Sequence, residues 1–262
     1  MNERLVLSRQ KLRTYLTCQR RFQLRYLRPL SWPVAPQEAQ WRAAAERGQA
    51  FHQLLERHFL GLAVDPGRDA QINRWWETFS QSGPDIPPGV RLPEINITVP
   101  IGNHLLTGRF DLLVLNGPAG HIFDWKTEQH PRSTADLVAD WQTRLYLAIL
   151  AEGGAALLPG SQAFDPDLIK LTYWFVQAPQ HTATLTYSRA QHEVNWAEIK
   201  LLVTEIGEKP ASEAPWPLTD NWSACGRCAY QVFCGRQAAP QGDDLLDWTE
   251  GEEPWRLELE RF

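Results

Sequence analysis

The spacing of the four cysteines constrains this chain more than any other sequence feature. Cys225, Cys228 and Cys234 form a C-x2-C-x5-C run, and Cys18 lies near the opposite end of the chain. Four thiolates are a common ligand set for one metal centre. A shared centre would join the two ends and close a loop of about 200 residues, which is entropically unfavourable without strong ligation. We therefore expect these cysteines to converge on a metal.

Thiolate chemistry alone leaves two candidates for that metal, a zinc ion and an iron–sulfur cluster, of which zinc is the commoner. The chain has 262 residues, of which 43% are hydrophobic, enough for a substantial core. It contains no run of 18 apolar residues, so we expect no membrane contact. The start of the sequence lacks an apolar signal core, which favours a cytoplasmic protein, where clustered cysteines bind metal rather than form disulfides.

Charge is distributed unevenly along the chain. The net charge of −5 argues by itself against nucleic-acid binding, yet residues 1–28 contain eight basic residues and one acidic residue. A basic segment of this kind can bind phosphates, although a solvated helix face is the alternative. Residues 243–260 reverse the balance, with eight acidic residues and one basic residue. We expect a disordered, solubilising tail there; the alternative is an autoinhibitory segment that covers the basic region.

The order of hydrophobic patterns predicts an α/β fold with a mixed central sheet, flanking helices and a helical N-terminal wrap. Helices are expected at 8–27, 37–60, around Trp75, 133–152 and 189–206. Strands are expected at 95–99, 105–115, 121–126, 168–176 and 182–187, with a hairpin turn at 116–120. We expect residues 1–240 to form one domain that the cysteine centre closes, followed by the acidic tail at 241–262.

Two aspartates and a lysine stand out within the predicted hairpin. Asp111 lies in one strand, and Asp124 and Lys126 lie two residues apart in the next, so their side chains share a face. Two carboxylates on adjacent strands repel each other, and hard cations such as Mg²⁺ or Mn²⁺ prefer such oxygen ligands. A neighbouring lysine can orient or deprotonate water, so these residues suit phosphodiester hydrolysis. The alternative is an ordinary surface Asp-x-Lys.

Other polar residues extend this candidate site. His52 lies on the predicted helix at 37–60 and can offer a neutral imidazole to the same metal. Gln142 and Tyr146 lie four residues apart, on one face of a later helix. Each is equally compatible with ordinary helix packing. Glu94 precedes the first predicted strand, and we do not assign it as a ligand.

These residues occur in an order that resembles one nuclease family. The motifs are Gly48-x3-His52, Gly108-x2-Asp111, Asp124-Trp125-Lys126 and Gln142-x3-Tyr146, enclosed by one cysteine before and three after. Together they resemble the RecB-like branch of the PD-(D/E)xK nuclease superfamily. The cysteines resemble its iron–sulfur form, which includes CRISPR-associated RecB-like exonucleases, the AddB nuclease domain and the nuclease–helicase that trims replication flaps.

The resemblance implies a restriction-endonuclease-like core and a division of roles. His52, Asp111, Asp124 and the backbone carbonyl of Trp125 would hold Mg²⁺ or Mn²⁺, while Lys126 would position the attacking water. Gln142 and Tyr146 would bind DNA or order the site. Cys18, Cys225, Cys228 and Cys234 would hold a structural [4Fe-4S] cluster in preference to zinc.

The resemblance also implies a deoxyribonuclease, an exonuclease rather than an endonuclease, that acts on single-stranded DNA or DNA ends in repair, recombination or CRISPR adaptation. A helicase or a CRISPR integrase is the expected partner. The alternative is a non-catalytic or partner-dependent DNA-binding subunit of a helicase–nuclease or integrase complex. The sequence contains no G-x4-G-K-[ST] motif, so no helicase motor is expected in it.

Overall fold

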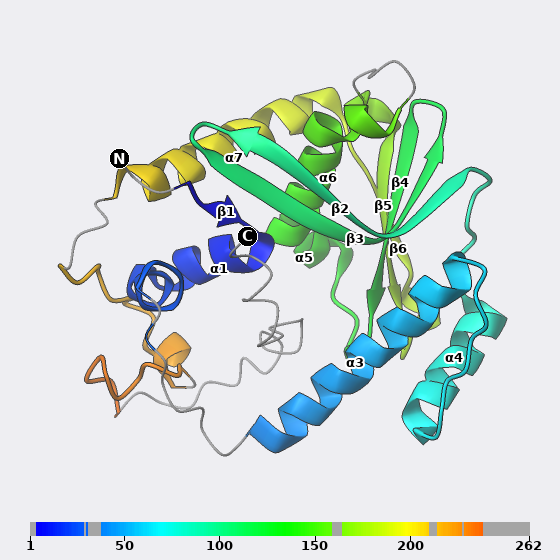
Figure 1. Ribbon diagram of the computed structural model, residues 1–262, viewed down its shortest axis with the longest axis horizontal. Helices are drawn as coiled ribbons and strands as arrows, with labels where there is room; N and C mark the ends of the chain where they lie inside the picture. The colour runs from blue at the N-terminus through cyan, green and yellow to red at the C-terminus, as the bar shows by residue number, and fades with distance from the viewer. Residues whose placement is uncertain are drawn as a thin grey trace.

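A mixed sheet of six strands lies at the centre of the protein, in the order β1-β3-β4-β5-β6 with β2 paired to β3 (Figure 1). The structure is a computed structural model that describes residues 4–28, 30, 38–158, 164–209, 214–226 and 228–237. The strands are β1 (Val6–Leu7), β2 (Val90–Ile101), β3 (His104–Asn116), β4 (Ala119–Lys126), β5 (Ile169–Phe175) and β6 (Ala183–Thr186). The predicted fold class is confirmed, whereas the predicted acidic tail lies outside the described residues.

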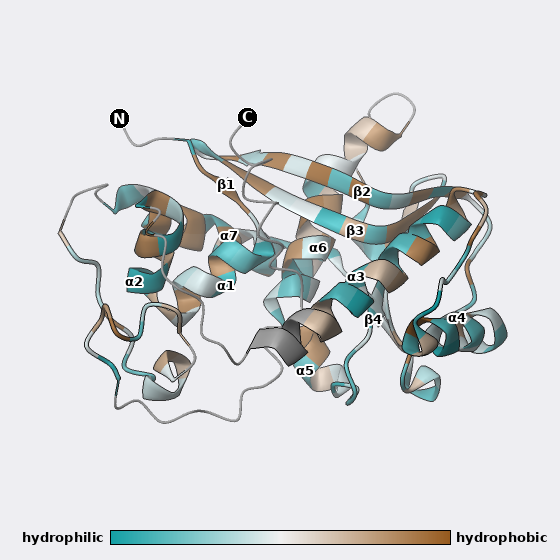
Figure 2. Cartoon of the chain, turned by 60° about the horizontal axis from the view of Figure 1, so that its bottom comes forward, coloured by the Kyte–Doolittle hydropathy of each residue, from teal (hydrophilic) through white to brown (hydrophobic). Residues whose placement is uncertain are grey.

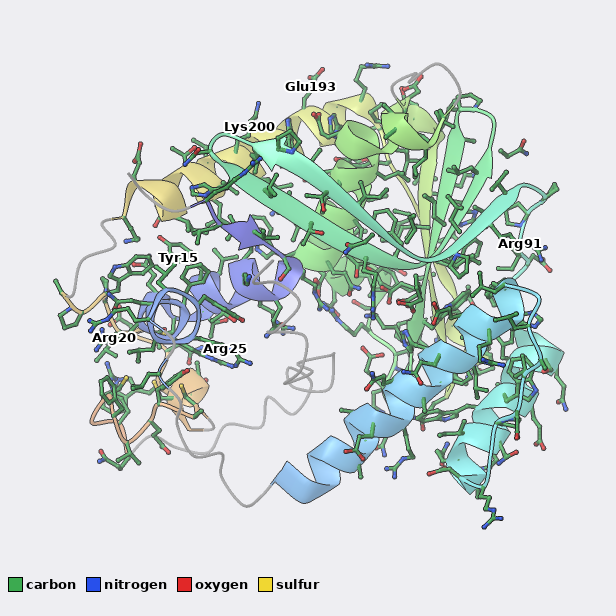
Figure 3. The ribbon with its side chains drawn as sticks, viewed as in Figure 1. Tyr15, Arg20, Arg25, Arg91, Glu193 and Lys200 are labelled. Carbon is green, nitrogen blue, oxygen red and sulfur yellow. The ribbon has the colours of Figure 1, made fainter. Side chains whose placement is uncertain are left out.

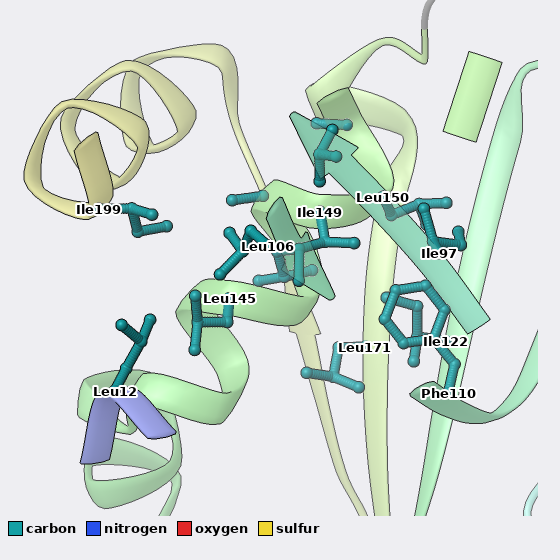
Figure 4. Close-up of a cluster of buried hydrophobic side chains, with 14 of the residues drawn as sticks. Leu12, Ile97, Leu106, Phe110, Ile122, Leu145, Ile149, Leu150, Leu171 and Ile199 are labelled. Carbon is teal, nitrogen blue, oxygen red and sulfur yellow. The ribbon is translucent and has the colours of Figure 1, made fainter. Parts of the chain in front are cut away.

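Helices cover both faces of the sheet. On one face, α1 (Arg9–Thr17), α6 (Trp141–Gly153) and α7 (Arg189–Glu208) pack over the larger hydrophobic cluster (Figure 4). On the other face, α3 (Glu38–Phe59) and α4 (Ala70–Ser82) enclose a smaller, aromatic-rich cluster. The shorter helical elements are α2 (Gln19–Phe22), η1 (Gln23–Leu27), α5 (Thr134–Ala139), η2 (Gly154–Leu157), η4 (Pro166–Leu168), η5 (Pro179–His181) and η6 (Trp222–Cys225).

The sequence of β3 reflects this double coverage. Its residues from Leu112 to Leu115 are all buried, as expected for a strand with helices on both faces. In β2, polar and apolar residues alternate because one side of that strand stays in water (Figure 2). No helix in the described part of the chain has the length and apolar character to cross a membrane.

The predicted helix at 8–27 is interrupted at Cys18. Its backbone there is extended, with φ −162° and ψ 112°, and its Sγ accepts a hydrogen bond from the Arg21 amide at 3.4 Å. The chain therefore runs as α1, a break, α2 and the π-helical η1. Periodicity continues through the break because the buried residues on either side, Tyr15 and Phe22, face the same core.

The N-terminal helices contact the C-terminal cysteine segment directly. The Arg20 amide donates to the Pro217 carbonyl at 3.1 Å, and the Trp216 amide donates to Gln23 Oε1 at 3.0 Å. The rings of Phe22 and Trp216 stack with their centroids 6.0 Å apart. The two ends of the fold thus meet, as the cysteine spacing predicts.

Candidate active site

Asp111 lies where β3 and β4 separate. The two strands pair from Leu112 opposite Phe123 toward the hairpin turn, and past that pair the Trp125 amide donates to Asp111 Oδ2 at 2.8 Å. The carboxylate thus replaces a strand carbonyl as the acceptor. Within one strand residue the N–H and C=O groups point to the same side, so the Trp125 carbonyl also projects toward this gap.

His52 reaches the same carboxylate from α3. Its Nδ1 lies 3.3 Å from Asp111 Oδ1, and the two side chains are 26% and 12% exposed. Gly48, one turn earlier, explains the approach: a Cβ there would lie 3.1 Å from Thr127 Oγ1, tighter than ordinary packing. The sequence prediction that His52 and Asp111 come together therefore agrees with the geometry.

Glu94 is the site residue that the sequence reasoning set aside. It lies on β2, directly across from Asp111, because the neighbouring residues of both strands pair in register. Its φ of 50° turns its carboxylate toward the site. Potential ligand atoms of His52, Glu94 and Asp111 all lie within 4.8 Å of one another. A carboxylate directly before an alternating strand was the signal that the sequence offered.

Asp124 lies beside this group of three and holds Lys126. It is 2% exposed and lies next to the His52–Glu94–Asp111 group rather than within it. Its Oδ1 is 2.9 Å from Lys126 Nζ, and its Oδ2 accepts from Gln142 Nε2 at 2.5 Å. The side-chain oxygen of Gln142, Oε1, in turn accepts a hydrogen bond from Lys126 Nζ at 3.0 Å. These three buried side chains form a closed ring of contacts that fixes the lysine.

Helix α6 carries Gln142 and Tyr146, and two features fix its position. Asp140 caps its first turn by accepting from the Gln142 amide at 2.7 Å, and it also pairs with Arg132 and, at 4.0 Å, with Arg9 of α1. Gly108 allows close packing, because a Cβ there would lie 3.0 Å from Ile149 Cδ1. The helix predicted at 133–152 is accordingly divided into α5 and α6 at Asp140.

The electrostatics of the site favour a bound cation. Burial disfavours the charged form of His52, but Asp111, Glu94 and Asp124 outweigh it and raise the pKa of His52 to about 9. Burial and the Asp111 charge raise the pKa of Glu94 to about 7. Burial and both aspartates raise the pKa of the Tyr146 phenol, which therefore stays protonated. Two carboxylates and an imidazole are the donor set that Mg²⁺ or Mn²⁺ accepts.

The four cysteines converge on a second location. All are free thiols, and charges on Cys18 and Cys228 act on the other thiols of the group, so the four are neighbours. Burial raises the pKa of the Cys225, Cys228 and Cys234 thiols, while nearby arginines lower it. Four neighbouring thiolates are a ligand set for a zinc ion or for an iron–sulfur cluster.

Comparison with known protein families identifies the superfamily of this chain. The family model of the PD-(D/E)XK nuclease superfamily matches residues 6–235, so the chain belongs to that superfamily. Among solved structures, one described as "Crystal structure of SSO0001" is 14% identical, with a TM-score of 0.39, and the match covers 92% of this chain and 90% of that one. A search of curated proteins found no match. Membership of the superfamily indicates a nuclease that uses divalent metal ions.

Proposed function

We propose that this protein is a Mg²⁺- or Mn²⁺-dependent deoxyribonuclease of the RecB-like branch, an exonuclease that acts on single-stranded DNA or DNA ends. The observation that carries the proposal is the position of Asp111, which contacts both His52 and the Trp125 amide. It joins helix α3 to the end of β4, where Lys126 is held. A donor set for a cation and a fixed lysine thus lie side by side.

His52, Glu94, Asp111 and the Trp125 carbonyl would hold the cation, which when bound polarises the scissile phosphate and lowers the pKa of a water ligand. Asp124 would complete the set. Each of its oxygens contacts Lys126 or Gln142 and keeps a second lone pair, so Asp124 can bind the cation while it holds the lysine. This coupling links occupancy of the cation site to the position of the lysine.

Lys126 would orient the attacking water and stabilise negative charge on the phosphate. Its side chain is 5% exposed, and its ammonium group is held by Asp124 and Gln142, with the Tyr173 ring 5.5 Å from it. Gln142 therefore acts as a positioning residue for Lys126. Tyr146 lies on the same face of α6 as Gln142 and packs edge-on against Phe110 of β3. It would contact DNA or order the site.

The four thiols would hold a [4Fe-4S] cluster that fastens the N-terminal helices to the C-terminal segment. The arginines near them suit an anionic cluster. Protein purified without oxygen should show broad visible absorption and contain iron and sulfide. Colourless protein with stoichiometric zinc would reject this assignment.

The function is tested with linear, end-blocked and circular single-stranded DNA, each with Mg²⁺ or Mn²⁺. We expect metal-dependent degradation of the linear substrate alone, abolished in Asp111→Asn and Lys126→Met. Gln53→Ala, an exposed change beside His52 on α3, is the matched control and should retain activity. Protein that binds the metal and DNA but leaves every substrate intact would instead indicate a non-catalytic DNA-binding subunit of a helicase–nuclease or integrase complex.

A further inference from the structure

Two aromatic side chains are exposed on the C-terminal cysteine segment. Trp222 is 47% exposed and Phe233 is 44% exposed, and they are the only aromatic residues among the exposed large hydrophobic residues of the described chain. Two more exposed apolar side chains, Leu218 and Val232, lie in the same segment. Aromatic surface gathered in one exposed segment is a feature of binding sites rather than of packing.

These two rings are far more exposed than the other aromatic residues of the same region. Buried aromatic residues of this region include Phe22, Trp216 and Tyr230, which are at most 7% exposed, and the rings of Phe22 and Trp216 join the chain ends. Trp222 and Phe233 lie outside that group. Each has an arginine over one ring face: the Arg236 guanidinium is 3.9 Å from the Trp222 centroid, and that of Arg20 is 5.6 Å from the Phe233 centroid. We call these four residues the stacking surface.

The charge around the stacking surface is positive. Residues 4–28 contain eight basic and no acidic residues, and Arg20 and Arg25 extend beside the cysteine segment in Figure 3. Arg21 and Arg25 act on Cys228, which places them near the thiols as well. In the described part of the C-terminal segment, 214–226 and 228–237, Asp220 is the one acidic residue. A polyanion is therefore the complementary partner.

We propose that the stacking surface binds single-stranded DNA, with unpaired bases on Trp222 and Phe233 and phosphates on the surrounding arginines. Stacked aromatic rings with basic side chains are the general means of binding a single strand without sequence preference. Bases in a duplex are already stacked on each other, so the surface selects unpaired DNA. This inference deepens the proposed function and rests on it for its substrate.

Helix α1 connects the stacking surface to the active site. Its last residue precedes Cys18, whereas its first residue, Arg9, pairs with Asp140 at the start of α6. Nine residues at 1.5 Å each span about 14 Å, a length that a strand of a few nucleotides can follow. A strand held on the stacking surface would thus be led along basic side chains toward Lys126.

The test measures binding without cleavage. The cluster-loaded, full-length protein is titrated, in the presence of EDTA, with labelled oligothymidine, with the same backbone carrying abasic sites, and with blunt duplex DNA. Trp222→Ala and Phe233→Ala should each weaken oligothymidine binding by about 5- to 100-fold, the range for loss of one stacked base. Trp222→Phe should retain most of the affinity, and Leu201→Ala, an exposed change on α7, should retain all of it.

The abasic probe separates stacking from charge. Wild-type protein should bind it more weakly than oligothymidine, and Trp222→Ala should weaken its binding no further. Equal affinity of wild-type and Trp222→Ala protein for oligothymidine would overturn the inference even if cleavage is normal. Loss of affinity for the abasic and duplex probes as well would also overturn it, because it indicates a general defect. Absence of cleavage with these binding differences intact would reject only the nuclease proposal.

Discussion

Glu94 shows how one backbone conformation can complete a site. A non-glycine residue at φ 50° carries a conformational cost of about 1–3 kcal/mol, which persists only where the surroundings enforce it. Here the Arg109 Nε atom holds the Glu94 carboxylate at 2.8 Å, opposite Asp111. Sequence periodicity identifies strand residues that alternate, and Glu94 departs from that pattern. Register across β2 and β3, which brings Glu94 to Asp111, is not visible in one sequence.

Glu94→Gln should have opposite effects on the thermal stability of the metal-free and the Mn²⁺-bound protein. Without metal, the change removes one of two neighbouring negative charges and should raise the thermal midpoint slightly. With Mn²⁺, a tenfold loss of affinity would reduce the stabilisation by the metal by about 1.4 kcal/mol. Thermal unfolding with and without Mn²⁺ measures both effects. Glu193→Gln on the outer side of α7 is the control, and an unchanged Mn²⁺ shift in Glu94→Gln would contradict Glu94 as a ligand (Figure 3).

His121 gives a residue-level prediction for pH. Burial, with a contribution from Lys170, lowers its pKa from 6.5 to about 4, and the ring stacks on Phe123 and contacts Thr172 Oγ1 at 2.7 Å. Above pH 6.5 the ring is neutral in both folded and unfolded chains, so its contribution does not vary. As pH falls from about 6.5 to 4, the unfolded chain binds a proton that the folded chain rejects, and stability decreases.

His121→Asn should therefore reduce the loss of stability between pH 7 and pH 5, measured by urea unfolding. The exposed His181 serves for comparison, and His181→Asn should leave the pH dependence as it is in the wild type. If the free energy of unfolding falls equally between pH 7 and pH 5 in wild-type and His121→Asn protein, groups other than His121 dominate the loss of stability in acid.

At the scale of elements, two helices that the sequence predicts as continuous, 8–27 and 133–152, are each divided in the structure. Cys18 separates α1 from α2, and Asp140 separates α5 from α6. Each side chain accepts a hydrogen bond from the first turn of the following helix. Periodicity cannot detect such breaks when both helices face one core, and cysteine is not a usual cap. The strands on either side of the hairpin turn, predicted at 105–115 and 121–126, match β3 and β4 to within two residues.

Asp140→Ala should affect both stability and activity. Loss of an N-cap costs about 1 kcal/mol, and the loss also releases Arg9, Arg132 and the first turn of α6, which carries Gln142. The turnover number should fall because Lys126 loses its fixed partner. Ser188→Ala, which removes the cap of α7, should lower stability by a similar amount and leave turnover unchanged. Equal activities of the two variants would show that the cap does not position the site.

For the whole molecule, the sequence predicts which residues meet but not how closely. His52, Asp111 and the Asp124–Lys126 pair lie together at one site, and the distant cysteines are neighbours at another. The division of the carboxylates does not follow from the sequence: Asp124 engages Lys126 and Gln142, and Glu94 joins His52 and Asp111. That division depends on the contact of Gln142, on α6, with Asp124 and Lys126, which forms only when the helix packs on the sheet.

The proposed cysteine cluster would cross-link the two ends of the fold. Cys18 and Cys225 are 207 positions apart, and by the loop-closure model a cross-link over such a length stabilises the folded chain by about 5 kcal/mol. Cys228→Ser should lower the thermal midpoint and expose the N-terminal helices to proteolysis. The remaining contacts of Phe22 with Trp216 and of Gln23 with Ala214 should prevent complete unfolding.

The decisive comparison is between Cys228→Ser and Ser223→Ala, a nearby change that leaves all four thiols in place. Thermal unfolding and the rate of cleavage after residues of α1 are measured for both, together with iron content. On the proposed assignment of an iron–sulfur cluster, Ser223→Ala should contain iron and unfold at nearly the wild-type midpoint. If Cys228→Ser loses its iron yet unfolds at the wild-type temperature, the packing of the chain ends, rather than the cysteine centre, closes the fold.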